Sequence, residues 1–429
     1  MNYSEAIGFL YNQLPVYHRV GKAAYKANLD NTLKLDSCFD SPHRKFRSVH
    51  IAGTNGKGSV SHMLASVLQE AGVKTGLYTS PHLKDFRERI RINGSMIPES
   101  EVIDFVTRNR HLLDEIRPSF FEMSVAMAFD YFAREETEVV VVETGLGGRL
   151  DSTNIITPLL SIITNIGYDH MDLLGDTLPQ IASEKAGIIK EKVPVIIGES
   201  DPETDGVFMR MAGEKHSDIL FADKIYSCDL SPADNEPGGR RFAVTGKRDG
   251  GTISGIAGLT GDYQEKNLPV VVTAFGILKD HFSLDEDDLR NGIRNVLTNT
   301  GLQGRWQTIG QNPVVICDTG HNGPGLKWVI RQLKSLKAGK IHFVIGFVND
   351  KDLSLVLPLF PKDSAYYFTR AQVPRALDQD ILRTHASGYG LAGNAFGSVA
   401  EALAEARRNA APGDVVFVGG STFIVAEVL

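Results

Sequence analysis

Cysteine is scarce in this chain, and the few cysteines present exclude two common kinds of cross-linked scaffold. Cys38, Cys228 and Cys317 are scattered over 429 residues and show neither a CxxC pair nor a histidine at metal-ligand spacing. This pattern excludes a disulfide framework and a structural zinc site, and it is typical of proteins from a reducing compartment. We expect each cysteine to be a small buried apolar side chain.

A basic excess and a long apolar run are also missing. The 45 lysines and arginines are outnumbered by 52 aspartates and glutamates, which gives a formal net charge of −7. No basic segment with interleaved aromatic residues offsets this charge, so we expect no nucleic-acid partner. No segment has the roughly 18 apolar residues of a membrane span, and residues 1–5 lack the basic start of a signal peptide. We therefore expect a cytoplasmic protein that does not bind membranes.

What the chain does have is a glycine-rich loop with one lysine, between a predicted strand (46–52) and a predicted helix (59–71). Glycines allow backbone N–H groups to converge on phosphate oxygens, and the helix N-terminus and the lysine add positive charge. Only two residues separate the first glycine from Gly-Lys, so this is a variant of the Walker loop. An ordinary glycine-rich turn is the alternative. The residues expected to bind nucleotide phosphates are Gly53, Thr54, Asn55, Gly56, Lys57, Gly58 and Ser59.

Alternating strand and helix patterns predict an α/β fold with two domains. A chain of this length exceeds the usual size of one core. We expect a P-loop domain with a mostly parallel sheet over residues 1–298, a linker at 299–304, and a smaller Rossmann-like α/β domain at 305–429. Their junction is an expected ligand cleft. The predicted strands are 74–80, 138–144, 159–166, 313–319, 341–348, 365–369 and 414–420, and short hairpins are expected at 219–261. The predicted helices are 99–116, 121–134, 178–189, 285–297, 325–336, 353–359, 378–384 and 400–410.

Polar clusters follow three of the predicted strands, at residues 78–82, 143–151 and 165–170. The carboxyl ends of parallel strands meet at one sheet edge, where such folds bind ligands. Glu143 and His170 would therefore lie near the glycine-rich loop and could hold magnesium that bridges nucleotide oxygens. Taken singly, either residue is more often a structural hydrogen-bonding group. Together with the loop, they favour a metal site.

Six strings along the chain carry a more specific signal than the loop alone. They are AGTNGKGS, YTSPHL, ETGLGGRLDSTN, TNIGYDHMDLLGDT, IASEKAGIIK and GSTFIVAEV. In this order and spacing they resemble the folylpolyglutamate synthase and dihydrofolate synthase family of the Mur ligase superfamily, from about Tyr17 to the C-terminus. The resemblance implies a ligase of folate and one-carbon metabolism that uses ATP to phosphorylate a carboxylate. The amine of L-glutamate then displaces the phosphate to form an amide.

The resemblance also assigns metal and catalytic residues. One Mg²⁺ would be held by Ser80 and Glu143, and a second by His170, with Lys57 shielding phosphate charge. Lys185 matches a family lysine that CO₂ carbamylates, which converts a cation into a carboxylate-like anion. The alternative is that Lys185 is an exposed lysine on its helix.

Further residues match the family's nucleotide contacts. Asn267 would lie near the nucleotide, Arg305 would reach the phosphates from the second domain, and Asp318 and His321 would complete the contacts. The chain departs from the family pattern Asp-x-Ala-His-Asn-Pro, because it reads Asp-Thr-Gly-His-Asn-Gly-Pro at 318–324. Tyr263 also replaces a common histidine. Both departures affect the expected backbone geometry.

Four residues match the substrate side of the family's site: His82, Phe121, Asp151 and Ser152. A flat pterin can stack on the Phe121 ring, and an aspartate can accept hydrogen bonds from its amino group. The alternatives are a core phenylalanine and a helix-capping aspartate. The expected substrates are dihydropteroate, reduced folates and L-glutamate.

We expect a bifunctional enzyme that adds glutamate both to dihydropteroate, as a dihydrofolate synthase, and to folylglutamate, as a folylpolyglutamate synthase. Three other functions compete with this prediction. A folylpolyglutamate synthase without the dihydropteroate activity is the nearest alternative. A cell-wall Mur ligase would need a nucleotide-sugar domain before the loop, and 52 residues are too few for it. A P-loop switch protein would need a guanine-reading Asn-Lys-x-Asp motif, which the sequence lacks. The resemblance implies a monomer.

Overall fold

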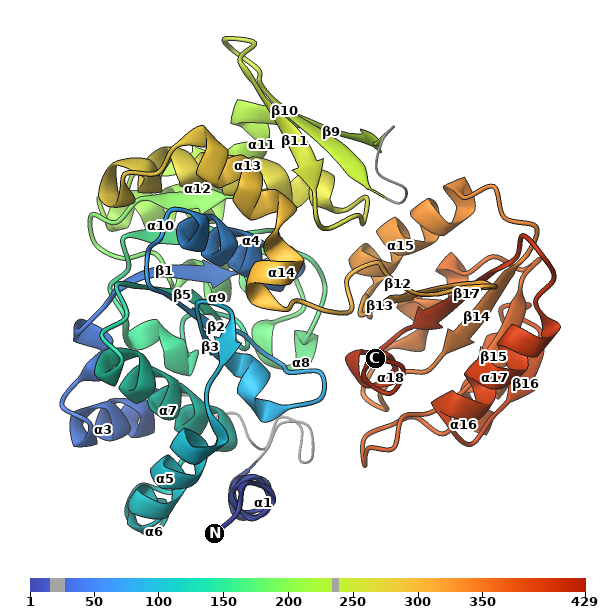
Figure 1. The fold of residues 1–429 in the computed structure, drawn as a ribbon, viewed down its shortest axis with the longest axis horizontal. Helices are drawn as coiled ribbons and strands as arrows, with labels where there is room; N and C mark the ends of the chain where they lie inside the picture. The colour runs from blue at the N-terminus through green and yellow to red at the C-terminus, as the bar shows by residue number, and fades with distance from the viewer. Residues whose placement is uncertain (16–27, 234–238) are drawn as a thin grey trace. The chain divides into compact units, whose positions relative to one another are not determined.

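The computed structural model describes residues 1–15, 28–233 and 239–429. The expected start of the family resemblance at Tyr17 lies outside these residues, as does most of the Asp-Asn-Glu-Pro-Gly-Gly loop at 234–239. The described chain forms two compact units (Figure 1). The first unit comprises residues 1–258 and 264–301, and the second comprises residues 259–263 and 302–429.

An eight-stranded sheet forms the centre of the first unit, with the order β4-β3-β2-β5-β1-β6-β7-β8. Only β3 and β4 run antiparallel to their neighbours, so the prediction of a mostly parallel sheet is confirmed. Residues 139–142 are all valine and all buried, as expected for a strand covered on both faces. The strands are β1 (Arg47–Ala52), β2 (Thr75–Tyr78), β3 (Ile90–Ile92), β4 (Ser95–Met96), β5 (Val139–Glu143), β6 (Leu160–Ile163), β7 (Val195–Ile197) and β8 (Ile219–Phe221).

Helices surround this sheet, and several of them differ from the sequence prediction. The helix predicted at 99–116 is interrupted at Arg110 and forms α5 and α6. Among the helices that were not predicted are α1, α3, α10 and the long α12, whose valines at 270–272 are typical of a strand. The α-helices are α1 (Tyr3–Gln13), α3 (Asp30–Cys38), α4 (Lys57–Glu70), α5 (Glu99–Asn109), α6 (His111–Ile116), α7 (Phe120–Arg134), α8 (Met171–Leu174), α9 (Leu178–Ala186), α10 (Asp205–Glu214), α11 (Ala222–Ile225), α12 (Gln264–Phe282), α13 (Glu286–Arg294) and α14 (Val296–Thr300). Three 3₁₀ turns are η2 (Pro42–Arg44), η3 (Phe86–Arg89) and η4 (Ser152–Ile155).

The hairpins expected after residue 219 form a separate antiparallel sheet. Its strands are β9 (Tyr226–Pro232), β10 (Arg240–Gly246) and β11 (Thr252–Ala257), in the order β11-β10-β9 (Figure 1). The buried side chains of Phe242 and Val244 alternate along β10 with more exposed ones, so one face of this small sheet is packed.

The second unit contains a six-stranded sheet with the order β12-β13-β17-β14-β15-β16, in which only β12 is antiparallel. Its strands are β12 (Gln307–Gln311), β13 (Val314–Asp318), β14 (Ile341–Ile345), β15 (Ala365–Phe368), β16 (Gly393–Ala395) and β17 (Val415–Gly419), and its helices are α15 (Gly323–Ser335), α16 (Gln379–Ser387), α17 (Val399–Asn409) and α18 (Thr422–Ala426). The helix predicted around 353–359 is wrong. That segment forms two 3₁₀ turns, η5 (Leu353–Leu355) and η6 (Leu357–Leu359), and Pro358, which has no N–H for an α-helical hydrogen bond, disfavours one continuous helix there.

The cysteines differ in burial, so the expectation that all three are buried is wrong. Cys317 is buried in β13, Cys228 is half-buried in β9, and Cys38 is exposed at the end of α3; all three are free thiols. Within the described ranges, no helix combines the length and the apolar character that crossing a membrane requires.

Candidate active site

The glycine-rich loop connects β1 to α4, and the segment after β6 holds it in shape. Gly53 has a φ of 146°, and a Cβ there would lie 1.9 Å from Thr164 Oγ1, so only glycine fits. Thr164 donates from Oγ1 to Asn55 O (2.6 Å), and the Asn55 N–H donates to Asn165 Oδ1 (2.9 Å). Thr54 Oγ1 accepts from the Gly167 N–H (3.0 Å). The geometry of the loop therefore depends on the segment after β6, which lies more than 100 residues further along the chain.

Two lysine ammonium groups converge on the carbonyl oxygen of Gly53. Lys57 Nζ lies 3.0 Å from this oxygen and 3.3 Å from Thr54 O, and Lys185 Nζ lies 2.9 Å from Gly53 O. Lys185 is only 4% exposed, so it is not the surface lysine of the alternative interpretation. Burial, and then the charge of Lys57, lower the pKa of Lys185 from 10.5 to about 7. This concentration of positive charge at a helix N-terminus suits an anionic phosphate.

Helix α12 brings Asn267, the residue expected near the nucleotide, against the loop. A Cβ on Gly56, whose φ is 86°, would lie 2.3 Å from Asn267 Oδ1. Asn267 Nδ2 donates to Gln264 Oε1 (2.7 Å), and Gln264 Nε2 donates to Ser59 Oγ (3.3 Å). Gln264 was not among the residues predicted for the site. Its position three residues before Asn267 on one helix face could have indicated it.

Ser80 and Glu143 lie side by side after the neighbouring strands β2 and β5. The Ser80 N–H donates to Glu143 Oε2 (3.2 Å), and Glu143 is 5% exposed. His170 is the N-cap of α8, with a φ of 50°. No group of three or more His, Cys, Asp or Glu side chains in residues 1–15, 28–233 and 239–429 could hold a metal ion. A cation at Ser80 and Glu143 would therefore need oxygens from phosphate or water.

The predicted substrate residues Phe121 and Asp151 both contact the loop after β5. A Cβ on Gly145 would lie 2.5 Å from Phe121 Cζ, so the ring packs directly on this backbone. Asp151 Oδ2 accepts the N–H of Leu146 (2.8 Å). Asp151 also caps η4, whose first residue is the buried Ser152, so the capping role named in the sequence analysis is present.

A buried hydrogen-bond chain extends from Asp151 to β1. Thr153 Oγ1 donates to Asp151 Oδ1 (2.6 Å), and His50 Nε2 lies 2.8 Å from the same Oγ1. Because the threonine proton points to the carboxylate, His50 Nε2 carries a proton and donates. Burial, and then the charge of Lys190, lower the pKa of His50 to about 3, so the ring is neutral. His50 and Thr153 were not among the predicted site residues.

His82 joins the loop after β2 to the N-terminal helix. Arg89 Nε donates to His82 Nδ1 (2.7 Å), so Nε2 carries the ring proton and donates to Tyr11 Oη (2.9 Å). Arg89 is buried, and its guanidinium lies 5.4 Å from the Phe120 ring centroid. His82 thus lies between α1 and the segment that carries Ser80.

In the second unit, Asp318 at the end of β13 organises a compact polar cluster. Its Oδ2 accepts from Tyr263 Oη and from the Trp306 N–H (both 2.7 Å), and its Oδ1 accepts from the Gly320 N–H (2.7 Å). Burial raises the pKa of Asp318, and these hydrogen bonds oppose the rise. Tyr263, which replaces the common histidine, is thus a hydrogen-bond partner of the predicted nucleotide residue.

The other predicted residues of the second unit lie around Thr319. Arg305 Nη1 donates to Thr319 Oγ1, and His321 Nδ1 lies 3.0 Å from Thr319 O, so this ring nitrogen donates. Asn322 caps α15 by accepting from the Gly325 N–H (3.0 Å). The displaced Pro324 falls in the first helical turn, where its missing N–H has no partner to lose.

Comparison with known proteins identifies both units. Residues 51–275 match the Mur ligase middle domain, and residues 304–422 match the Mur ligase glutamate ligase domain. A dihydrofolate synthase/folylpolyglutamate synthase of Bacillus subtilis is 34% identical over 83% of this chain and 84% of its own length. A probable bifunctional folylpolyglutamate synthase/dihydropteroate synthase of Haloferax volcanii is 32% identical over the whole chain, which spans half of that protein.

A solved structure agrees with these matches. Escherichia coli FolC in complex with DHPP and ADP superposes with a TM-score of 0.84 and 28% identity, over all of this chain and 97% of that one. The fold, the two matched domains and the similar relatives all point to one group. The chain therefore belongs to the folylpolyglutamate synthase and dihydrofolate synthase family of the Mur ligase superfamily, and it is an ATP-dependent ligase.

Proposed function

We propose that this ligase adds L-glutamate both to dihydropteroate and to folylglutamate, with ATP converted to ADP and phosphate. The observation that carries the proposal is the convergence of Lys57 and Lys185 on the Gly53 carbonyl in a variant phosphate loop. The charge of Lys57 at a helix N-terminus suits the negative charges of a nucleotide phosphate, and the buried Lys185 places a second nitrogen, whose pKa is lowered to about 7, against the same carbonyl.

The proposed reaction has two steps. A substrate carboxylate oxygen attacks the γ-phosphorus of ATP, and the bond from this phosphorus to the bridging oxygen breaks. ADP is released, and the substrate now carries an acyl phosphate. The amine of glutamate then attacks the acyl carbon, loses a proton and expels inorganic phosphate. Lys57 is placed to offset the charge that moves onto the phosphate oxygens, and loop N–H groups between Gly53 and Ser59 hold these oxygens.

Magnesium fits the oxygen-rich pair of Ser80 and Glu143. A hydroxyl and a carboxylate are hard donors, and Mg²⁺ in proteins is usually bound by one or two such groups together with phosphate and water. When bound, the ion would withdraw charge from the phosphates. Glu143 would direct its carboxylate toward the ion while Ser80 N–H holds Oε2 (3.2 Å). His170 is proposed for the second ion.

Carbamylation fits the environment of Lys185. The neutral amine is the form that reacts with CO₂, and burial beside Lys57 favours that form because it lowers the pKa to about 7. A carbamate on Nζ would carry negative charge toward Lys57, which would replace repulsion between two ammonium groups with attraction.

The folate substrate is proposed to lie against Phe121 and Asp151 on the loop after β5. Phe121 offers a ring face for a pterin, while Thr153 and Leu146 N–H orient the two carboxylate oxygens of Asp151. Because this carboxylate already accepts several internal bonds, it can take only a small number of donors from a ligand.

The test is product analysis by mass spectrometry with Mg-ATP and glutamate. One reaction contains dihydropteroate and the other contains a reduced folate with one glutamate. We expect one added glutamate in the first and one or more in the second. Product from the reduced folate alone would identify a folylpolyglutamate synthase without the first activity. ATP hydrolysis that does not depend on glutamate, with no amide product, would refute a ligase role.

A further inference from the structure

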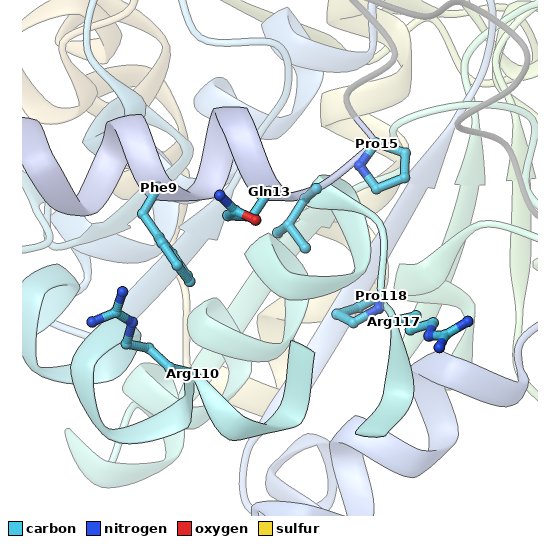
Figure 2. A pocket seen from close by; sticks show the side chains of 7 residues that line it. Phe9, Gln13, Pro15, Arg110, Arg117 and Pro118 are labelled. Atoms are coloured by element: carbon cyan, nitrogen blue, oxygen red, sulfur yellow. The ribbon is translucent and has the colours of Figure 1, made fainter. Parts of the chain in front are cut away.

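A pocket on the first unit lies apart from the residues predicted for the active site. It has a volume of about 460 Å³ and lies between α1 and the segment around α6 (Figure 2). None of the predicted site residues lines it. Hydrogen-bonding groups that the proposed reaction does not use lie instead beside the phosphate loop, at the first residue of α12.

The side-chain amide of Gln264, the first residue of α12, is buried beside the phosphate loop. Gln264 is 1% exposed, so its amide depends on partners within the protein. Its Oε1 accepts from Asn267 Nδ2 (2.7 Å), and its Nε2 donates to Ser59 Oγ (3.3 Å). Ser59 lies in the first turn of α4 and is 2% exposed. The amide therefore joins the residue expected near the nucleotide to a serine of the phosphate loop.

The directions of these two hydrogen bonds determine the role of the Ser59 oxygen. Asn267 contributes an N–H, so Gln264 offers it the carbonyl oxygen of its amide. The other end of the same amide is an NH₂ group, which can only donate to Ser59 Oγ. A hydroxyl has one proton to donate and two lone pairs that accept. One lone pair of Ser59 is thus occupied, and its proton is not used in this contact.

The backbone carbonyls that a serine in this position often binds have other partners. In a helix, a serine hydroxyl can donate to the carbonyl three or four residues earlier, which here belongs to Gly56 or Asn55. The Gly56 carbonyl accepts from the Val60 N–H (2.9 Å), and the Asn55 carbonyl accepts from Thr164 Oγ1 (2.6 Å). Within residues 1–15, 28–233 and 239–429, no group accepts the Ser59 proton. This proton is therefore available to a bound group.

An available proton at the first turn of α4 favours contact with phosphate over contact with a metal ion. Phosphate is proposed to bind at this helix N-terminus beside Lys57, and its oxygens are strong acceptors. A metal ion would bind an oxygen lone pair instead, and the Ser59 proton would then lack an acceptor among the described residues. Ser80 and Glu143, which follow β2 and β5, offer hard oxygens for the metal at a separate position.

We propose that Gln264 is a positioning residue that holds Ser59 Oγ as an acceptor and so directs the Ser59 proton to a phosphate oxygen of the nucleotide. Gln264 itself does not touch the nucleotide in this arrangement, and Mg²⁺ is left to Ser80 and Glu143. The proposal rests on the proposed phosphate site of the loop. It does not depend on which folate accepts glutamate, because it concerns only the nucleotide.

The test measures the Kd of ADP by isothermal titration calorimetry, once with Mg²⁺ and once with EDTA in place of the metal. Ser59→Ala removes the donor, and we expect Kd to rise roughly tenfold under both conditions, the value of a hydrogen bond to a charged group. Gln264→Met keeps the length of the side chain and removes both amide bonds, so Kd should rise roughly threefold or more. In the double variant, Kd should match that of Ser59→Ala, since Gln264 acts through Ser59.

Two further variants sharpen this measurement. Thr273→Val is the matched control, because it removes another buried hydroxyl of α12, which donates to Pro269 O (2.7 Å) within the same helix, and it should leave Kd unchanged. Gln264→Glu can still accept from Asn267, but its carboxylate would also accept the Ser59 proton and turn it away from the phosphate. Kd should then exceed that of Gln264→Met, and this excess should shrink when Ser59 is alanine. Thermal unfolding checks that each variant is folded.

Three results would overturn the proposal. The first is an unchanged Kd in Gln264→Met. The second is an additive loss in the double variant, which would mean that Gln264 acts through Asn267 and not through Ser59. The third is a loss in Ser59→Ala that disappears in EDTA, which would make Ser59 a metal ligand. If Gln264→Met does not fold, the same comparison with Ser59→Ala is made with Gln264→Glu. A wild type that binds no ADP would instead refute the proposed phosphate site, a result distinct from the other three.

Discussion

At the scale of single residues, the main feature is the pair of lysines that share one carbonyl oxygen. Lys57 begins α4 and Lys185 belongs to α9, yet both donate to Gly53 O at about hydrogen-bond distance, 3.0 and 2.9 Å. Burial disfavours the charged form of Lys185 and lowers its pKa, and the nearby charge of Lys57 adds to the effect. The buried Lys185 is therefore the lysine that becomes neutral near pH 7, and its neutral amine can be modified.

Lys57→Ala should lower ADP formation by roughly 10²- to 10³-fold, because it removes the charge that offsets the transferring phosphate. The fold should persist, since the described hydrogen bonds of Nζ end on two loop carbonyls. A coupled ADP assay measures the loss, and thermal unfolding checks the fold. Lys74→Ala, which removes a partly exposed lysine elsewhere, is the control. Near wild-type turnover in Lys57→Ala would remove this residue from the site.

The lowered pKa of Lys185 predicts how activity and stability should each change with pH. Activity that needs the neutral amine should increase as pH rises through about 7, the lowered pKa of this group. Stability should also increase between about 7 and 10.5, because in that window the unfolded chain binds a proton that the folded chain does not. Lys185→Met should abolish activity and also flatten the stability change, as followed by unfolding at several pH values.

The proposed carbamate on Lys185 has a separate test, in which short carboxylates are added to the variant Lys185→Ala. Partial recovery of ADP formation is expected if a carboxylate-like group at this position supports the reaction. Full activity of Lys185→Ala without any addition would contradict a role for this lysine.

At the scale of elements, glycines determine how closely α12 and β6 approach the phosphate loop. Gly53 allows the contact with Thr164, and Gly56 allows the contact with Asn267. Both have positive φ values, so a side chain would meet backbone strain as well as a neighbour. The loop is thus shaped by packing on both sides.

Gly56→Ala should destabilise the protein by about 1–3 kcal/mol and strongly reduce ATP turnover, because the left-handed backbone is strained and the new Cβ would lie 2.3 Å from Asn267 Oδ1. Gly72→Ala is the matched control near the other end of α4. Gly72 has a φ of 76° but no atom within 4 Å of a Cβ, so it meets the strain without the clash. Equal effects of both substitutions on turnover would refute the steric explanation.

At the scale of the whole molecule, one short segment lies within the sequence of the first unit but folds as part of the second unit. Residues 259–263 group with the second unit, although residues on both sides of them belong to the first. The Asp262 N–H donates to Gln332 Oε1 (2.7 Å), and Tyr263 Oη donates to Asp318 Oδ2 (2.7 Å). The second unit is therefore completed by a segment that a simple linear boundary would assign elsewhere.

Tyr263→Phe should destabilise the second unit by about 1–3 kcal/mol, because the buried Asp318 loses one of its hydrogen bonds. The pKa of Asp318, which burial already raises, should rise further, so the stability loss should be larger at neutral than at acidic pH. Thermal unfolding at two pH values measures both effects. Tyr389→Phe is the control, since its hydroxyl has no hydrogen bond within the described residues. A similar loss in both variants would contradict the assigned role of the Tyr263 hydroxyl.

The sequence by itself determined the fold class, the loop and the family, because glycine spacing, strand periodicity and ordered motifs are local properties of the chain. The helix predicted at 353–359 was wrong, because this segment forms two short 3₁₀ turns around Pro358. No helix was predicted for α12, whose Pro269 and run of valines are untypical of a helix. Only the tertiary structure decided that Lys185 is buried against Gly53, that Gln264 contacts Ser59 and that His50 supports Asp151. These contacts join residues from 103 to 205 positions apart. Burial and pKa depend on such long-range packing, which no local pattern encodes.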